Sequence, residues 1–335
     1  MVKNDYGNEG INSAFAELRQ RVYENGLLHA SPYFYTRRIA GMLMLLAASM
    51  VILTHAYGFW IQMVNAILLA FTFGQISFFI HDVGHGQVMN NRLRRYVNPF
   101  FSAVMGSSLD WWVQKHNQHH AYPNQEGRDP DILFDFLAFS EKQAREKRGF
   151  SKVMVRNQHF LFFPFLLFET LNLRRASIVY LFKQRSIASI LDIFLIIGHL
   201  AVFILLLVIF LPIDTAIAFA LLHWGALGVY LGTSFAPNHK GMPIIKPDID
   251  SGFIEQQVST SRNVRGGWFV DFWYGGLNYQ IEHHLFPSMP RNRLKHAAVI
   301  VEKFCKERSI PYASVSIAES YRQIFGHFAR IGNSV

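Results

Sequence analysis

The sequence contains few charged residues and almost no cysteine. Asp, Glu, Lys and Arg together make up 16% of its 335 residues, against about 25% in typical soluble domains. The single cysteine, Cys305, excludes a disulfide framework and any zinc or iron–sulfur site built on thiolates. Apolar residues make up 51% of the chain, Phe occurs 31 times, and the mean hydropathy is +0.15. This balance excludes a disordered, collagen-like or coiled-coil protein and indicates an integral membrane protein.

Four apolar stretches are long enough to cross a bilayer, which takes about 20 residues of helix. A bend near Gly58 and Trp60 separates the first two, and Pro212 prevents helix continuation between the last two. We therefore predict two transmembrane hairpins. Their spans are residues 39–59, 61–80, 187–211 and 215–235. A shorter apolar run, residues 160–168, contains Pro164 and is typical of an interfacial or re-entrant segment.

All 32 Lys and Arg residues lie outside the predicted spans and outside both hairpin turns. Residues 1–38 hold 5 of them, residues 81–185 hold 15, and residues 236–335 hold 12. By the positive-inside rule these three segments and both termini face the cytoplasm. The net charge of +9 is attributed to this topology and to anionic lipid headgroups, not to nucleic acid.

Residues 1–38 contain no apolar stretch of the kind that marks a cleavable signal peptide. Their apolar residues are instead spaced among polar ones, which predicts a cytoplasmic amphipathic segment. These apolar residues are Phe15, Leu18, Val22 and Leu27.

Seven of the 15 histidines fall into three clusters. The clusters are HDVGH (81–85), HNQHH (116–120) and QIEHH (280–284). Residues three or four apart share one face of a helix, so each spacing lets imidazoles converge on metal ions. Gln280 occupies the place of a third histidine in the last cluster, and His239 follows the fourth span. All of these residues lie on the same predicted side of the membrane.

The remaining seven histidines belong to no cluster. Five of them are attributed to packing, hydrogen bonding or solvent exposure: His29, His55, His159, His296 and His327. His199 and His223 lie inside predicted spans, where an ionisable group is costly. Because neither has a clustered neighbour, both are left out of the predicted site.

The number and type of the candidate ligands indicate the metal. Imidazole binds zinc, copper, iron and nickel, and the chain offers no thiolate cluster that would favour a softer ion. Eight histidines and Gln280 exceed the four positions of tetrahedral zinc but suffice for two ions of higher coordination number. We therefore predict a centre of two irons, with open positions for O₂ where an apolar chain can enter from the bilayer.

Three stretches of the sequence resemble the membrane fatty acid desaturase family. They are HDVGH (81–85), KHNQHHAYPN followed by DPDI (115–132), and QVSTSRNV followed by GGLNYQIEHHLFPSMPR (257–291). The final Gln-x-x-His-His is similar to that of the front-end branch and its bacterial relatives. The resemblance runs over residues 39–300.

This resemblance implies an all-α integral membrane protein in which four transmembrane helices support a helical cytoplasmic cap with a di-iron site. The cap would be built from residues 81–185 and 236–335, and the desaturase domain would cover residues 39–335. Members of the family use a di-iron centre, O₂ and two electrons to remove two hydrogens from an unactivated acyl chain. We therefore expect a fatty acyl desaturase that introduces a cis double bond. Carried over residue by residue, the family's metal ligands are His81, His85, His116, His119, His120, His239, Gln280, His283 and His284.

Other residues near the clusters are candidates for supporting roles. Polar groups that can orient the imidazoles, or hold a metal-bound water, are Asn238, Asp82, Asp129, Asp131 and Glu282. The competing interpretation of these residues is ordinary turn and cap chemistry. Candidates for lining an acyl tunnel are Trp111, Trp112, Trp273 and Tyr279. Aromatic residues near a membrane surface also serve as interface anchors, which leaves two interpretations of this group.

No His-Pro-Gly-Gly motif of a fused haem-binding cytochrome domain occurs, and the segment 1–38 before the first span leaves no room for one. We therefore expect no bound haem and a separate electron donor, such as a ferredoxin or similar carrier with its reductase. The short termini are similar to those of bacterial members, so we expect the protein to lie in a bacterial plasma membrane. The expected substrate is an acyl chain on coenzyme A, a carrier protein or a glycerolipid, and membrane lipid is the other partner.

Two other functions fit parts of the pattern. The same metal centre can hydroxylate a lipid or hydrocarbon, because hydrogen abstraction is common to both reactions. Only the wider match, above all GGLNYQIEHHLFPSMPR, favours desaturation. A non-catalytic metal-binding membrane protein, such as a divalent-cation transporter or sensor, should place ligands at mid-membrane. The candidate metal ligands predicted within the membrane are few, namely Asp192, His199 and His223, and none of them belongs to a cluster. This argues against a transporter.

Overall fold

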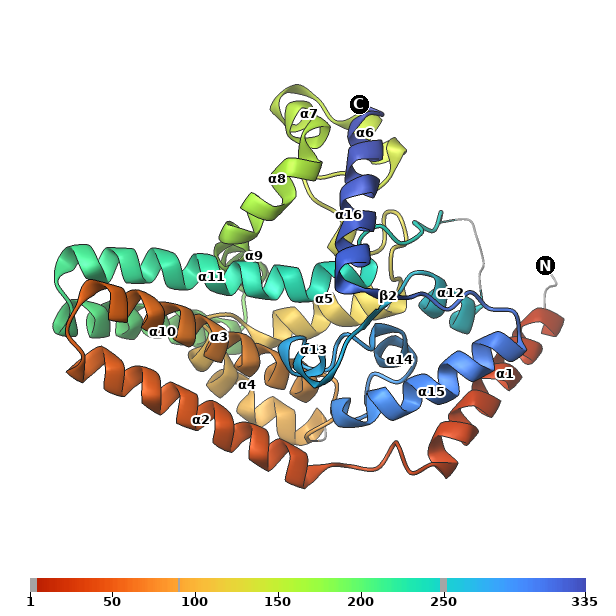
Figure 1. Cartoon of the computed structure of the whole chain (residues 1–335), viewed down its shortest axis with the longest axis horizontal. Coiled ribbons are helices and arrows are strands. Elements are labelled where there is room, and N and C mark those ends of the chain that lie inside the picture. The colour runs from red at the N-terminus through yellow and green to blue at the C-terminus, as the bar shows by residue number, and fades with distance from the viewer. Residues whose placement is uncertain (1–4, 90, 248–251) are drawn as a thin grey trace. The chain divides into compact units, whose positions relative to one another are not determined.

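The computed structural model describes residues 5–89, 91–247 and 252–335 (Figure 1). Within these ranges the chain is predominantly helical, which confirms the prediction of an all-α protein. The strands found in these ranges are two short ones, β1 (Asn263–Arg265) and β2 (Ser314–Ser316), which pair in parallel. Val264 lies opposite Val315 in this pairing.

Four helices of the described ranges are long and apolar enough to cross a membrane. They are α2 (Pro32–His55), α3 (Phe59–Gly84), α10 (Ile187–Phe210) and α11 (Ile213–His239). The prediction of four transmembrane helices is therefore confirmed by length and composition. Together with the apolar composition, these helices identify an integral membrane protein.

The predicted bounds of these helices need correction. The first span, predicted to begin at residue 39, starts at Pro32, because proline in the first turn lacks only an N–H that would have no helical partner. It ends at His55, before Gly58, whose φ of +121° is a conformation that glycine adopts far more readily than other residues. The second span continues to Gly84, so His81 lies inside α3 and not beyond its end.

The chain divides into two compact units. The first, called here the terminal unit, comprises Met1–Ala30, Lys115–Phe162 and Ser234–Val335. The second, the span unit, comprises Ser31–Gln114 and Phe163–Thr233. The predicted cap included residues 81–185, but the parts before Lys115 and after Phe162 group with the spans. The reason is that α4 (Asn91–Met105) and α9 (Glu169–Gln184), which lie in these parts, pack against α10.

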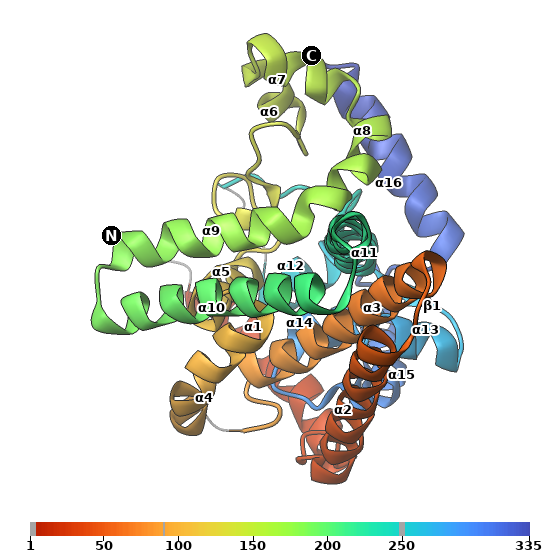
Figure 2. The ribbon, with the colours of Figure 1, turned by 90° about the vertical axis from the view of Figure 1, so that its left-hand side faces the viewer.

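The span unit is built on α2 and α3, which lie side by side in Figure 1, and on α10, which runs beside α9 in Figure 2. Its remaining elements are α4 and η2 (Leu166–Phe168). Leu53 of α2, Met63 of α3, Leu207 of α10 and Phe219 of α11 belong to one buried apolar cluster. This cluster joins all four spans.

The apolar run around Pro164 forms the end of α8 (Gln158–Phe165) followed by η2. Leu166 of η2 lies against α11 at Gly228 and Gly232. A Cβ atom on Gly228 would stand 2.3 Å from the backbone oxygen of Leu166. Glycine at this position is therefore required for the close approach of η2 to the span.

Three helices pass from one unit into the other, and the helices not yet named belong to the terminal unit. The connecting helices are α5 (Leu109–Ala121), α8 and α11. The terminal unit contains α1 (Asp5–Glu24), η1 (Pro130–Ile132), α6 (Glu141–Glu146), α7 (Gly149–Arg156), α12 (Phe253–Ser259), α13 (Trp268–Trp273), α14 (Gln280–Leu285), α15 (Arg291–Glu307) and α16 (Ile317–Gly332).

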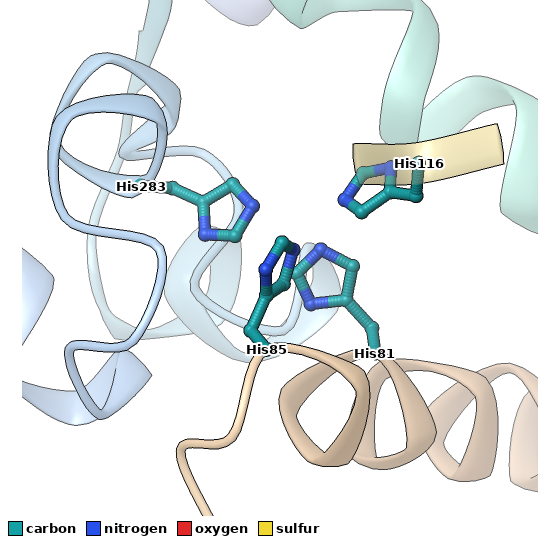
Figure 3. A group of neighbouring side chains, drawn as sticks. All are labelled: His81, His85, His116 and His283. Carbon is teal, nitrogen blue, oxygen red and sulfur yellow. The ribbon is translucent and has the colours of Figure 1, made fainter. Parts of the chain in front are cut away.

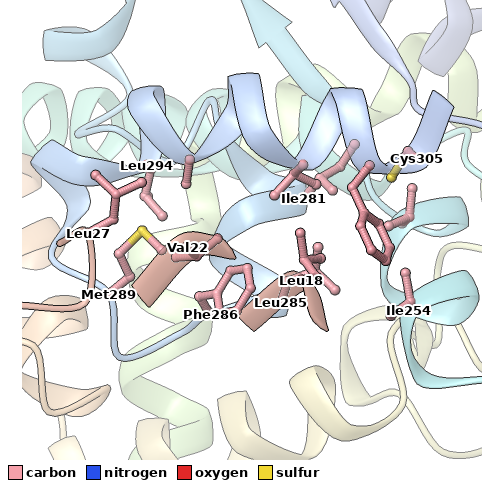
Figure 4. Packing of buried hydrophobic residues seen from close by; sticks show 14 residues of the cluster. Leu18, Val22, Leu27, Ile254, Ile281, Leu285, Phe286, Met289, Leu294 and Cys305 are labelled. Carbon is pink, nitrogen blue, oxygen red and sulfur yellow. The ribbon is translucent and has the colours of Figure 1, made fainter. Parts of the chain in front are cut away.

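The main core of the terminal unit lies between α1, α12, α14 and α15 (Figure 4). Leu18 and Val22 of α1 are fully buried there, together with Ile281 of α14 and Val301 of α15. The predicted amphipathic segment therefore forms a helix whose apolar side completes a protein core. This core supports α14, the helix that carries the last histidine cluster.

Candidate metal centre

Helix α5 carries His116, His119 and His120, as the spacing predicts. The three residues lie in its last two turns, and His119 is buried. The rings of His116 and His120 are in contact, with 3.1 Å between their Nε2 atoms. One helix thus presents three imidazoles to the interior of the terminal unit.

Helix α14 carries His283 and His284, both buried. The backbone N–H of Ile281 donates to Asn263 Oδ1 at 2.9 Å and ties the start of the helix to β1. Ile281 and Leu285 anchor its other side in the core of the unit. Since every residue of this short helix is buried, its two imidazoles have little freedom to turn away.

His239 is the last residue of α11 and lies in the terminal unit. It meets His119 and His284, and the candidate ligand nitrogens of these three residues all lie within 4.8 Å of one another. The Nε2 atoms of His119 and His239 are 3.3 Å apart. Three elements far apart in sequence therefore bring three imidazoles to one point.

The other ring nitrogen of each of these imidazoles is held by an acceptor. His119 Nδ1 lies 3.0 Å from both carboxylate oxygens of Asp129. His239 Nδ1 lies 3.0 Å from the backbone oxygen of Thr260. Because these partners only accept, each Nδ1 carries a hydrogen, and the Nε2 atom of the neutral ring then presents its lone pair.

His284 follows the same rule. Its Nδ1 lies 2.8 Å from Gln257 Oε1, while its Nε2 is buried without a hydrogen-bond partner among the described residues. Burial, and then the neighbouring histidines, lower the pKa of His284 well below its ordinary value, so the ring is neutral. Neutral imidazole is the form that ligates a metal, so rings whose Nε2 atoms converge in this way fit a metal ion.

His116 and His283 also belong to the terminal unit, and their rings stack with centroids 6.2 Å apart (Figure 3). His120 approaches His283 with ring centroids 4.8 Å apart, and it stacks on His284 at 4.2 Å. Through these contacts the terminal unit brings all six of its predicted ligand histidines into one group.

The first histidine cluster lies in the span unit and is described by itself. His81 belongs to the last turn of α3, His85 follows directly after the helix, and their ring centroids are 4.7 Å apart (Figure 3). Gly84 lets Trp112 approach closely, since a Cβ atom on Gly84 would stand 2.4 Å from the indole ring. The spacing thus brings both imidazoles beside each other, as predicted, but His81 lies within α3 and not after it.

Gln280 lies at the same centre as His239 but turns its nitrogen toward it. Gln280 Nε2 is 2.9 Å from His239 Nε2, and Gln280 Oε1 accepts a hydrogen bond of 3.1 Å from Asn238 Nδ2. Asn238 Nδ2 is also 3.1 Å from the backbone oxygen of Leu277. In this arrangement Asn238 supports Gln280, and the amide oxygen that would ligate a metal is occupied by that hydrogen bond.

A sequence comparison agrees with this geometry. A family model described as Fatty acid desaturase matches residues 58–316, a range that contains every histidine named in this subsection. The chain belongs to the fatty acid desaturase family. Its members are oxidoreductases that act on acyl lipids, and the family implies a di-iron centre.

Several curated relatives of this desaturase carry names that specify a position. The Delta(5) fatty acid desaturase fat-4 of Caenorhabditis elegans is 32% identical over 90% of this chain and 70% of its own length. The Acyl-lipid (9-3)-desaturase of Physcomitrium patens is 30% identical over 91% and 60%, respectively. The Delta(6)-fatty-acid desaturase fat-3 of Caenorhabditis elegans is 29% identical over 89% and 70%. The chain thus spans only part of the length of each of these relatives.

The acidic residues proposed to support the ligands of the desaturase differ in what they contact. Asp129 holds His119, and Asp131 lies 3.7 Å from the same ring while it pairs with Lys115. Burial raises the pKa of Asp131, but Lys115, His119 and Lys240 outweigh this effect and hold the pKa below its ordinary value. Asp131 therefore stays ionised beside the centre.

Glu282 and Asp82 differ from Asp129 in the contacts that they make. The Glu282 carboxylate accepts hydrogen bonds from Asn263 Nδ2 at 2.8 Å and from the Tyr312 hydroxyl at 2.9 Å. Burial raises the pKa of Glu282 to about 7, and these two donors oppose the shift. Its contacts hold α14 in place and do not reach a histidine ring. Asp82 Oδ1 lies 3.4 Å from His81 Nδ1, at the outer limit of a hydrogen bond.

The sequence alone did not reveal the residues whose hydrogen bonds position the candidate ligand histidines. Gln257 joins two clusters, because it accepts from His284 and donates to the backbone oxygen of His120 at 3.0 Å. Asn124 donates its backbone N–H to Asp129 at 2.7 Å and its side-chain amide to the backbone oxygen of His239 at 3.1 Å. Both residues lie in the motifs KHNQHHAYPN and QVSTSRNV, whose polar residues in a buried setting were the available signal.

Arg262, in the second of these motifs, fixes the end of the α11 span. Its side chain is fully buried and donates to the backbone oxygens of Pro237, at 2.8 Å from Nε, and Lys240, at 2.9 Å from Nη2. Its backbone N–H donates to the Asn238 oxygen at 2.8 Å. These contacts surround His239 on both sides and satisfy carbonyls that have no partner within the helix.

The aromatic tunnel candidates of the desaturase occupy different surroundings. Trp111 and Trp112 belong to the span unit, where Trp112 contacts the His81 ring with centroids 5.3 Å apart. Trp273 belongs to the terminal unit and is 37% exposed, and Tyr279 there is half-buried. The tunnel role of all four stays a prediction.

Proposed function

We propose that this desaturase is an O₂-dependent enzyme that introduces a cis double bond into an acyl chain at a di-iron centre held by histidines. The observation that carries the proposal is the set of three imidazoles, His119, His239 and His284, whose Nδ1 hydrogens are fixed and whose Nε2 lone pairs converge. Imidazole donors of this kind suit iron.

The proposed ligands are the eight clustered and adjacent histidines together with Gln280. Within the terminal unit the contacts between rings support this set. For His81 and His85 the support is their spacing at the end of a span and the family's motif. Ligation by Gln280 requires its amide to rotate so that Oε1 faces the metal. Asn238 Oδ1, which is buried and has no partner among the described residues, can then accept from the displaced Gln280 nitrogen.

In the proposed reaction, two neighbouring methylene groups lose one hydrogen each, and O₂ with two external electrons and two protons leaves as two waters. When bound, a di-iron centre supplies the reduced metal at which O₂ is activated. The chain's own residues keep that place dry and ordered: His119, His239 and His284 are buried, and Asp129 holds the Nδ1 proton of His119. Buried hydrogen-bond partners of this type fix ring orientation and raise ligand basicity.

The names of the relatives indicate the region of the acyl chain that is attacked. Two of them specify Delta(5) and Delta(6) positions. We propose that the double bond forms at a similarly short distance from the carboxyl group, as in the front-end branch that the Gln-x-x-His-His motif resembles. We further propose that electrons come from a separate donor and that the histidines face the cytoplasm of a bacterial cell, in accord with the placement of Lys and Arg.

Expression in a desaturase-deficient bacterial host tests the proposal. Total fatty acids are analysed by gas chromatography and mass spectrometry, with derivatisation that locates double bonds. We expect a new unsaturated product that is absent from a His119→Ala variant inserted in the membrane at the same level. A hydroxylated product would identify the hydroxylase alternative instead. If no new product forms and the purified protein contains one zinc and no iron, the proposal that the protein is an enzyme would be contradicted.

A further inference from the structure

Helix α13 is apolar on both of its sides. Val270, and Tyr274 directly after the helix, are buried in a small cluster with Val264 of β1. On the other side Trp268 is 77% exposed and Phe269 is 54% exposed. A surface helix of a globular domain normally turns polar residues outward, so an aromatic outer side indicates contact with something other than water.

The exposed aromatics form a continuous patch. The rings of Trp268 and Phe269 have centroids 6.0 Å apart, and Phe269 stacks on Trp273 at 5.8 Å. The acidic residue of the helix, Asp271, lies off this patch and is paired with Lys295 at 3.0 Å. Arg265 precedes the helix and is exposed. The patch therefore consists of large aromatic rings, and an exposed cation precedes it by three residues in the chain.

The place of α13 along the chain indicates what covers the patch. The backbone N–H of Arg262 donates to the oxygen of Asn238, so the segment leading to α13 starts at the end of the α11 span. A chain covers at most about 3.5 Å per residue, which keeps Trp268 within roughly 20 Å of that point. The 27 residues of α11 rise about 40 Å, against about 30 Å of hydrocarbon. The end of the helix therefore lies at the level of the lipid headgroups.

We propose that α13 is an interfacial anchor, whose residues Trp268, Phe269 and Trp273 insert among the lipid headgroups beside the exit of α11. Tryptophan suits this position, because its ring is apolar while its N–H can donate to headgroup oxygens. Arg265 faces the phosphates, which attract cations at the membrane surface. The anchor holds the terminal unit against the bilayer independently of any metal. It also assigns Trp273 to the lipid interface, the second of the two interpretations that its sequence position allows.

The single cysteine of the chain makes a direct test possible. Cys305 is fully buried, so a spin label attaches only to cysteines introduced on the surface. Trp268→Cys and Phe269→Cys report on the patch, and Phe269→Cys carries the test if the first variant does not fold. Lys142→Cys on α6, whose side chain is 67% exposed, is the control within the same unit. Ile197→Cys, 54% exposed in the middle of α10, is the reference for the bilayer interior.

The labelled proteins are reconstituted into vesicles of phosphatidylcholine and phosphatidylglycerol, and collisions of the label with O₂ and with a water-soluble nickel complex are measured. We expect the ratio of O₂ to nickel accessibility at Trp268 and Phe269 to lie well above that at Lys142 and below that at Ile197. A ratio equal to that at Lys142 would overturn the proposal, because the patch would face water. Low accessibility to both reagents would overturn it too, because protein, such as a second copy of the chain, would cover the patch.

Discussion

The Asp129→Asn substitution tests whether the carboxylate behind His119 tunes the proposed metal site. The Asp129 carboxylate is fully buried, and both of its oxygens lie 3.0 Å from His119 Nδ1. Oδ2 also accepts the backbone N–H of Asn124 at 2.7 Å, and Oδ1 accepts that of Asp131 at 2.8 Å. Asparagine keeps the shape of the side chain but replaces one acceptor with a donor.

Two effects of the substitution have separate magnitudes. One backbone N–H, of Asn124 or Asp131, then faces a donor, and a buried donor without an acceptor lowers the free energy of unfolding by about 1–3 kcal/mol. Loss of the charge behind a ligand imidazole weakens metal binding by about 10- to 100-fold, equivalent to about 1.4–2.7 kcal/mol. The two effects are measured separately, as the unfolding of the metal-free protein and as metal affinity.

The assay uses purified protein in detergent, stripped with a chelator and titrated anaerobically with Fe²⁺. The control is Asp271→Asn on α13, which removes a carboxylate paired with Lys295 in the same unit. We expect at least a tenfold loss of affinity for Asp129→Asn and a change of less than twofold for Asp271→Asn. A folded Asp129→Asn variant with wild-type affinity would refute the role assigned to this carboxylate.

Three further predictions concern other parts of the chain. Gly228→Ala should lower the melting temperature strongly, because the new Cβ atom would meet a backbone oxygen of η2. The control Gly198→Ala should have little effect, because no atom lies within 4 Å of a Cβ atom placed there. Equal changes in melting temperature would contradict the close approach of η2 to α11. Arg262→Lys should reduce the amount of iron bound per chain, because lysine cannot donate to both carbonyl oxygens at the end of α11. Arg291→Lys changes another buried arginine and should leave the iron content unchanged. Elemental analysis of the purified variants measures both. Burial raises the pKa of the Cys305 thiol to about 12, so little reactive thiolate is present at pH 8. Maleimide should therefore leave the folded protein unmodified and add one adduct after unfolding. Mass spectrometry detects the difference.

Local patterns in the sequence carried most of the information about individual elements. The apolar runs predicted the four spans, and the i, i+3, i+4 spacing predicted that His116, His119 and His120 share a helix. These predictions succeeded because they depend on one helix at a time. The bounds were less accurate, since the start of α2 depends on Ser31-Pro32 and not on hydrophobicity.

Relations between distant segments were beyond the sequence. Nothing in the pattern indicates that the backbone oxygen of Thr260 holds His239, because a carbonyl is present at every residue. The burial of α1 in the core of the terminal unit depends on α14 and α15, which lie near the opposite end of the chain. Likewise, the direction in which Gln280 turns its amide follows from Asn238 and Leu277, which come together only in the folded chain.

The convergence of three imidazole lone pairs has a consequence for the amount of protein that a cell retains. An unfolded chain has no such arrangement. A metal ion that binds only to the folded site therefore stabilises the folded state by mass action, by about 4.1 kcal/mol when the free metal concentration is a thousand times the dissociation constant. Quality-control proteases remove chains in proportion to the unfolded fraction. Scarcity of the metal would therefore shorten the lifetime of the desaturase itself, and membrane composition would respond to metal supply through protein abundance as well as through activity.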